Sequence, residues 1–179
     1  MPFYLAFLAT LMMLLSPSSY SETTDKVDNL IPTLTQWAQD PTIVDAIKNA
    51  NTTFKTQSHI NAVDKEWQDY SGISPLMLSM LESEAAKKLL SFESSASYYQ
   101  EIFITDKFGT NVAMTAKTSD YWQGDEKKFT QCFNKGEATI SSQEFDKSAQ
   151  KNLIHISIPV ISGSKVIGVM VVGVSPSSL

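Results

Sequence analysis

The last apolar stretch of the sequence constrains the fold most. Residues 166–174 are apolar throughout and are interrupted only by Gly168 and Gly173. Nine residues are too few to cross a bilayer as a helix, which needs about 20. A continuous apolar run of this length instead favours a central β-strand that is packed on both faces. The chain is therefore predicted to contain a sheet that buries both faces at this strand.

Three further segments carry strand patterns. Between residues 154 and 160, apolar side chains alternate with more polar ones, among them His155 and Ser157, so that one face of the strand is buried. A loop over 162–165 joins this strand to the apolar run. Upstream, residues 98–105 and 111–116 are predicted to form a second hairpin, whose turn has Gly109 where a positive φ is needed.

The first half of the sequence has helical periodicity. Apolar residues recur at intervals of three and four over residues 27–38, and a second segment starts at Asp40-Pro41, an N-cap followed by a first-turn proline. A third segment covers residues 60–70, and Ser74-Pro75 starts a fourth. Helices followed by strands predict an α+β fold.

The N-terminus predicts export. The apolar run over residues 3–15 has the length of a signal-peptide core, and cleavage after Ser21 would leave one domain over residues 22–179, with no membrane span in the mature chain. The start lacks the usual basic residues, so an uncleaved tether and a misplaced start are the alternatives. The predicted location is the periplasm.

Composition excludes several classes of function. The net charge is −5 and basic residues form no cluster beyond pairs, which argues against a nucleic-acid partner. The chain has no Arg, so an anionic ligand has to be held by Lys, backbone N–H groups or hydroxyls. Cys132 is the only cysteine and cannot form an internal disulfide; it is expected to be a buried apolar residue, the alternatives being an intermolecular link or a redox role.

The sequence also lacks a recognisable catalytic or metal-binding pattern. It has no nucleophile-elbow motif, and its two histidines, His59 and His155, are isolated. The acidic residues Asp120, Asp125 and Glu126 do not have the spacing of a calcium loop. We predict no enzyme, no cofactor and no metal, with a small exported hydrolase as the weakest alternative.

Several motifs together resemble the Cache superfamily, the PAS-like (PDC) extracellular sensor domains of bacterial chemoreceptors and histidine kinases. The segment 101–115 is similar to the opening hairpin, and 118–126 to the aromatic and acidic stretch that follows it in single-Cache members. Residues 156–169 match the closing strand pair, so the likeness extends over about residues 25–175. The resemblance implies a five-stranded antiparallel sheet, a long N-terminal helix with further helices packed on it, and a small-molecule cavity between the sheet and a loop.

The candidate ligand-binding residues lie mainly in that loop. Tyr121 and Trp122 are predicted to line the cavity, or alternatively to pack the loop onto the sheet. Asp125 is a candidate acceptor for an amine or hydroxyl, or the N-cap of the segment that begins at Glu126. Asp120 is similarly ambiguous, and Lys117 is a candidate anion contact or a solvated lysine.

Two more candidates lie near the closing strands. Asp146 precedes the return strand, where family members often carry an acidic residue, and is a candidate for the amine end of a ligand or a turn residue. His155 is on the polar face of its strand and is either a cavity residue or a structural histidine.

These observations predict a non-catalytic periplasmic sensor module that binds an amine, an amino acid or a short carboxylate. The absence of Arg argues against the usual clamp for an α-carboxylate. Because the sequence ends at Leu179, soon after the last strand, we expect a stand-alone form that presents its ligand to a membrane-bound kinase or chemoreceptor. A fragment of a longer receptor is one alternative for the chain, and a protein-interaction subunit without a ligand is the alternative function.

Overall fold

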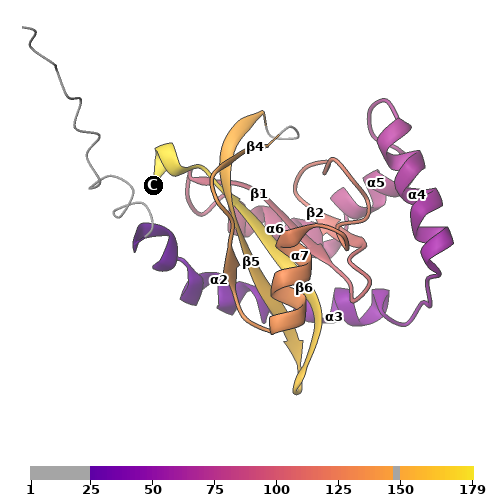
Figure 1. Cartoon of the computed structure of the whole chain (residues 1–179), viewed down its shortest axis with the longest axis horizontal. Coiled ribbons are helices and arrows are strands. Elements are labelled where there is room, and N and C mark those ends of the chain that lie inside the picture. Colours follow the sequence, from indigo (N-terminus) through magenta and orange to yellow (C-terminus); the bar gives the residue numbers. More distant parts are fainter. Residues whose placement is uncertain (1–24, 147–149) are drawn as a thin grey trace, which may run out of the picture.

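The computed structural model describes residues 25–146 and 150–179, so the predicted signal peptide over 1–21 lies outside the described residues. The helices and strands follow the predicted order, helices first (Figure 1). The helices are α2 (Ile31–Ala38), α3 (Pro41–Ala50), α4 (Gln57–Asp69), α5 (Pro75–Leu81), α6 (Glu84–Glu93), α7 (Lys127–Lys135) and the short 3₁₀ helix η1 (Pro176–Ser178). The strands are β1 (Tyr99–Thr105), β2 (Asn111–Met114), β3 (Thr139–Ile140), β4 (Glu144–Asp146), β5 (Lys151–Ser162) and β6 (Lys165–Val174).

The strands form one antiparallel sheet. Five of them follow the order β2-β1-β6-β5-β3, and β4 pairs with β5 outside this path. Both predicted hairpins are present: β1 pairs with β2, and β5 pairs with β6. Gly109 and Gly163 have φ values of 77° and 62° in the two turns, a conformation that favours glycine. The α+β fold class is therefore confirmed.

Strand β6 is central, as the apolar run predicted. Its alternate residues enter two different cores: Met170 and Val172 pack with α2, α3 and α6, whereas Val169 and Val171 pack on the opposite face. This second core receives Trp67 from α4 and residues of α5 and α7. Figure 1 shows α7 crossing in front of β5 and β6. The sheet thus has helices on both faces.

The N-terminal helical part is divided where the sequence predicted a new start. Helix α2 ends at Ala38, and Asp40 is the N-cap of α3, where its side chain accepts a hydrogen bond from the Thr42 N–H at 2.9 Å. Pro41 has no N–H to continue the preceding helix. In place of one long helix, the described residues therefore have α2 and α3 in succession.

The Asp40 cap gives a pH-dependent prediction. Partial burial raises the pKa of Asp40, but the bonds from Thr42 and the nearby Lys88 outweigh it and hold the pKa below its ordinary value of 3.8. A lowered pKa means that the stabilisation is present above 3.8 and is lost as the pH falls through the lower folded value. Asp40→Ala is expected to reduce the free energy of unfolding by about 1 kcal/mol at pH 7.

Urea denaturation at pH 7 and at pH 2–3 measures this effect. The difference in the free energy of unfolding between the wild type and Asp40→Ala should shrink at the acidic pH. Asp40→Asn should retain most of the stabilisation from the cap at both pH values. If Asp40→Asn and Asp40→Ala lost the same free energy of unfolding, the hydrogen bond of the side-chain cap would not be the source of the stabilisation.

Candidate functional site

The segment Lys117 to Glu126 forms a loop that is fixed at its start by hydrogen bonds. Lys117 donates from Nζ to the carbonyl oxygens of Tyr70 and Gly72, at 2.9 and 3.1 Å. This lysine therefore ties the loop to the end of α4. Its predicted role as an anion contact has no support from this position.

The aromatic pair of the loop packs against the α4 side of the protein. Tyr121 is 6% exposed and its ring lies 5.8 Å from that of Trp67. Trp122 donates from its backbone N–H to Asp64 Oδ1 and from Nε1 to the carbonyl oxygen of Phe108, both at 2.9 Å. Both aromatic residues therefore help to hold the loop in place, and a ligand-lining role for them stays a prediction.

The acidic residues of the loop have different surroundings. The Asp120 side chain accepts hydrogen bonds from Gln68 and Ser119, both at 2.6 Å. Asp125 is exposed, and the N-cap of α7 is Glu126 rather than Asp125. The alternative of an Asp125 cap is therefore wrong, and neither aspartate lines the pocket described next.

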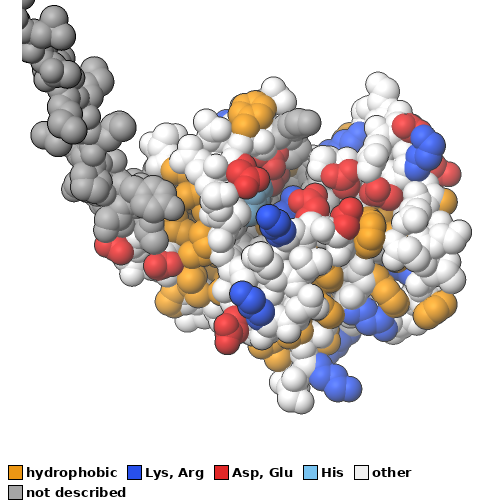
Figure 2. All heavy atoms as spheres, in the orientation of Figure 1, with side chains coloured by type: hydrophobic (Ala, Val, Ile, Leu, Met, Phe, Trp, Pro, Cys, Tyr) orange, Lys and Arg blue, Asp and Glu red, His pale blue; other side chains and the backbone are white. Residues whose placement is uncertain are grey.

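A pocket lies between α7 and strands β3, β4 and β5. Its volume is about 620 Å³. Figure 2 shows acidic and basic side chains gathered around a hollow on this face of the molecule. The lining residues are Ser119, Glu126, Lys127, Lys128, Gln131, Thr139, Ile140, Ser141, Ser142, Glu144, Phe145, Asp146, His155 and Ser157. Two of the seven predicted site residues, Asp146 and His155, are in this set.

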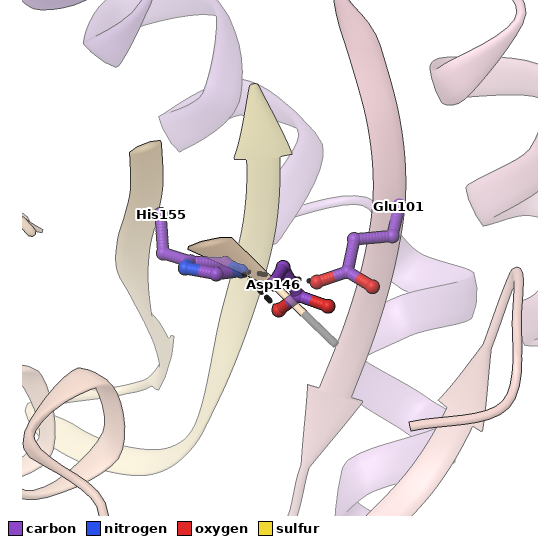
Figure 3. A group of neighbouring side chains, drawn as sticks. All are labelled: Glu101, Asp146 and His155. Carbon is purple, nitrogen blue, oxygen red and sulfur yellow. Dashed lines mark hydrogen bonds and ion pairs between the residues drawn. The ribbon is translucent and has the colours of Figure 1, made fainter. Parts of the chain in front are cut away.

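Three titratable side chains, Glu101, Asp146 and His155, converge, and the last two line the pocket (Figure 3). His155 Nε2 lies 3.0 Å from Glu101 Oε1 and 3.5 Å from Asp146 Oδ2. The side chains are 10%, 6% and 13% exposed for His155, Glu101 and Asp146. They come from three strands, β5, β1 and β4.

The carboxylates of Glu101 and Asp146 raise the pKa of the His155 imidazole. Burial by itself lowers the pKa of His155, but the hydrogen bonds to Asp146 and Glu101 outweigh burial, and the pKa lies above its ordinary value. The positive charge of Lys128 opposes this rise. Lys128 Nζ lies 3.1 Å from Glu126 Oε2 and 5.4 Å from the Phe103 ring centre, on the α7 side of the pocket.

Strand alternation places His155 and Ser157 on the pocket side. Ile154, Ile156 and Ile158 point into the core formed with α2 and α3, so the residues between them face the other way. His155 was predicted to lie on this polar face. The same alternation on β1 puts Glu101 on the side of Phe103.

Glu101 is a site residue that the sequence reasoning missed. It reaches His155 across β6, and the residue opposite both of them on β6 is Gly173. A Cβ atom at Gly173 would lie 2.7 Å from Glu101 Cγ and 3.3 Å from Glu101 Oε1. The missing side chain thus leaves the space that Glu101 occupies. A lone carboxylate in an apolar strand, together with a glycine in the central strand, is the signal that the sequence contained.

Cys132 lies on α7 and is fully buried, as predicted. Burial raises the pKa of its thiol to about 12, so the thiolate is not formed near neutral pH. Neither a nucleophile nor an exposed thiol is therefore available at this position.

In the described part of the chain, no helix combines the length and apolar character needed to cross a membrane.

The sequence matches no protein-family model and no curated protein. Solved structures are nevertheless similar. The extracellular domain of vpHK1S-Z8, a protein named as a histidine kinase, matches over 88% of this chain with a TM-score of 0.50 and 9% identity. The sensor domain of the Vibrio cholerae histidine kinase DctB covers 90% of the chain with a TM-score of 0.45 and 13% identity. The sensory domain of the Campylobacter jejuni chemoreceptor Tlp3, with isoleucine bound, covers 90% with a TM-score of 0.42 and 13% identity.

The chain spans 53%, 55% and 64% of these three domains. The match to vpHK1S-Z8 concerns the fold and extends over most of the described residues. The chain therefore shares the fold of this extracellular domain, in agreement with the fold that the resemblance implied.

Proposed function

We propose that this chain is a non-catalytic sensor module that acts outside the cytoplasm and binds a small polar metabolite between α7 and strands β3 to β5. The observation that carries the proposal is the pocket of about 620 Å³, whose lining includes Asp146 and His155. Sites for small ligands are concave and contain a few converging polar groups. The Cache-like fold supports a sensor role over an enzymatic one, although fold alone does not fix function.

The charges around the pocket favour a ligand with an ammonium group. Asp146 and Glu126 are carboxylates within the lining, and Glu144 adds a third at its exposed rim. A carboxylate accepts hydrogen bonds from an ammonium group strongly in a partly buried site. Lys127 and Lys128 line the α7 side, so an amino acid with opposite charges at its two ends also fits.

A thermal-shift screen of amines, amino acids and short carboxylates on the full chain tests the proposal. A ligand that binds the native state alone raises the melting temperature, by an amount that corresponds to about 2.7 kcal/mol at a concentration of 100 times Kd. Asp146→Asn is expected to abolish the shift because the charge that binds the ammonium group is lost.

Tyr121→Phe is the matched control for this experiment. Because Tyr121 packs on Trp67 and is outside the pocket lining, its conservative variant should retain the shift. The absence of a shift with every compound at millimolar concentration would contradict the proposal. Loss of the shift in Tyr121→Phe, but not in Asp146→Asn, would move the site to the loop predicted from the sequence.

One surface favours the alternative of a protein-interaction subunit. Four large apolar side chains are 42–46% exposed at and near the junction of α4 and α5: Tyr70, Ile73, Leu76 and Leu78. Exposed apolar side chains that lie together on one surface are typical of contact surfaces. A protein that binds no metabolite but loses a partner when Leu76 and Leu78 are changed to Ser would support this second function. The partner class that we propose for either function is a membrane-bound kinase or chemoreceptor.

A further inference from the structure

The Glu101, Asp146 and His155 side chains offer one imidazole nitrogen and two carboxylate oxygens to a common point. One ligand atom from each residue lies within 4.8 Å of the others. In a tetrahedral Zn²⁺ site with bonds of about 2.0–2.1 Å, neighbouring ligand atoms are separated by roughly 3.3 Å. The distances of 3.0 and 3.5 Å from His155 Nε2 to the two carboxylates are already close to that separation.

We propose that these three residues bind a divalent transition-metal ion, with Zn²⁺ as the reference ion. The site lies in the pocket of the proposed function and rests on that pocket being open to solutes. Binding of the ion requires His155 to lose its Nε2 proton, and the two carboxylates with the neutral imidazole then carry a charge of −2, which a divalent cation neutralises. Nitrogen and oxygen donors without a thiolate suit Zn²⁺, Ni²⁺ and Co²⁺ and disfavour Cu⁺.

Strand β6 is shaped to bring Glu101 and His155 together. Their strands flank β6, and adjacent strands are about 4.8 Å apart, so the two backbones are separated by roughly twice that distance. The gap is closed by the long Glu101 side chain, which crosses over Gly173 where any Cβ would be in its path.

The position of the site gives it a chemical role in ligand binding. Asp146 and His155 belong to the pocket lining, so a metal ion held by three protein ligands has its remaining coordination position toward the pocket. A carboxylate or amine of a small ligand fits there. The metal thereby supplies the anion-binding group that the arginine-free chain otherwise takes only from Lys, hydroxyls and backbone N–H groups.

Titration of the untagged, chelator-treated full chain with Zn²⁺ and Co²⁺ tests the proposal. We expect one ion per chain by isothermal titration calorimetry, and visible absorption bands of Co²⁺ bound to nitrogen and oxygen ligands. Loss of a group that only supports a metal ligand weakens binding 10–100-fold, so His155→Ala and Glu101→Gln are expected to weaken it by more than about 100-fold. His59→Ala and Glu66→Gln remove the same chemical groups outside the pocket lining and should bind as the wild type does.

The Co²⁺ spectrum reports on the metal directly, so it remains informative if a variant is less stable. Equal Zn²⁺ affinity in wild type and His155→Ala, or an absence of Co²⁺ bands in the wild type, would overturn the metal proposal. The metabolite screen, repeated with chelator and with Zn²⁺, separates the two proposals. A metabolite that binds with chelator while Zn²⁺ does not bind leaves the sensor function and removes the metal site. If Zn²⁺ binds but no metabolite binds either with chelator or with Zn²⁺, the metal site is kept and the sensor function is removed.

Discussion

Gly168→Ala is expected to lower the free energy of unfolding by about 3 kcal/mol or more. A Cβ atom at this position would lie 2.1 Å from the carbonyl oxygen of Thr105 and 3.0 Å from Ile47 Cγ2. The closest atom belongs to the backbone of β1, so no rotamer change relieves the contact and β1 must move away from β6. Overpacking of this kind commonly costs about 1–3 kcal/mol, and more where the backbone itself is displaced. Urea denaturation followed by circular dichroism measures the loss.

Gly173→Ala is the matched control because its contacts are with side chains. The atoms nearest to a Cβ there are Glu101 Cγ at 2.7 Å and Leu153 Cδ1 at 3.0 Å. Both can move, so we expect a smaller loss, of about 1–2 kcal/mol. Adding Glu101→Ala to Gly173→Ala should recover part of the lost stability. Adding Ile47→Ala to Gly168→Ala should not, because the contact with the Thr105 carbonyl oxygen remains. A loss below 1 kcal/mol for Gly168→Ala would contradict the packing described for β1 and β6.

Trp67→Ala has the second large expected effect, a loss of about 3–5 kcal/mol. Trp67 is 2% exposed in the core on the α7 side of the sheet, where its ring packs on Tyr121. Its Nε1 donates to the carbonyl oxygen of Thr118 at 2.9 Å and thereby joins α4 to the loop. Removal of the side chain leaves a cavity and a buried carbonyl without its donor. The free energy of unfolding from urea titration is again the measurement.

Trp67→Phe separates the two contributions. It keeps an aromatic ring beside Tyr121 but loses the bond to Thr118, for which we expect about 1–3 kcal/mol. Phe145→Ala serves as the aromatic control: Phe145 is 58% exposed, so its loss should change stability by less than about 0.5 kcal/mol. Comparable losses for Trp67→Ala and Phe145→Ala would show that α4 and the loop do not form a core.

The pattern of the strands was sufficient to predict the sheet. The apolar run over 166–174 has no polar side chain, and the structure places its alternate residues in two separate cores. The alternation around His155 predicted the polar face that borders the pocket. The short strands β3 and β4 were not predicted, because two or three residues carry no detectable period. Their position depends on pairing with β5 instead.

The candidate site could be predicted only in part, because it depends on strand order. Glu101 and His155 are 54 residues apart, and they meet only since β1 and β5 both flank β6 at Gly173. No local pattern contains that information. Tyr121-Trp122 could equally line a cavity or pack a loop, and the α4 residues that they contact, Trp67 and Asp64, are far away in the sequence. Asp146 and His155 were identified, and their role in ligand binding remains a prediction.

The location of a bound ligand tests the central claim most directly. Crystals of the full chain with the compound that gives the largest thermal shift would provide it. We predict electron density for the ligand between α7 and β5, with its polar end within hydrogen-bonding distance of Asp146 or His155. Density against the loop of Tyr121 and Asp125, or on the opposite face of the sheet against α2 and α6, would contradict the account.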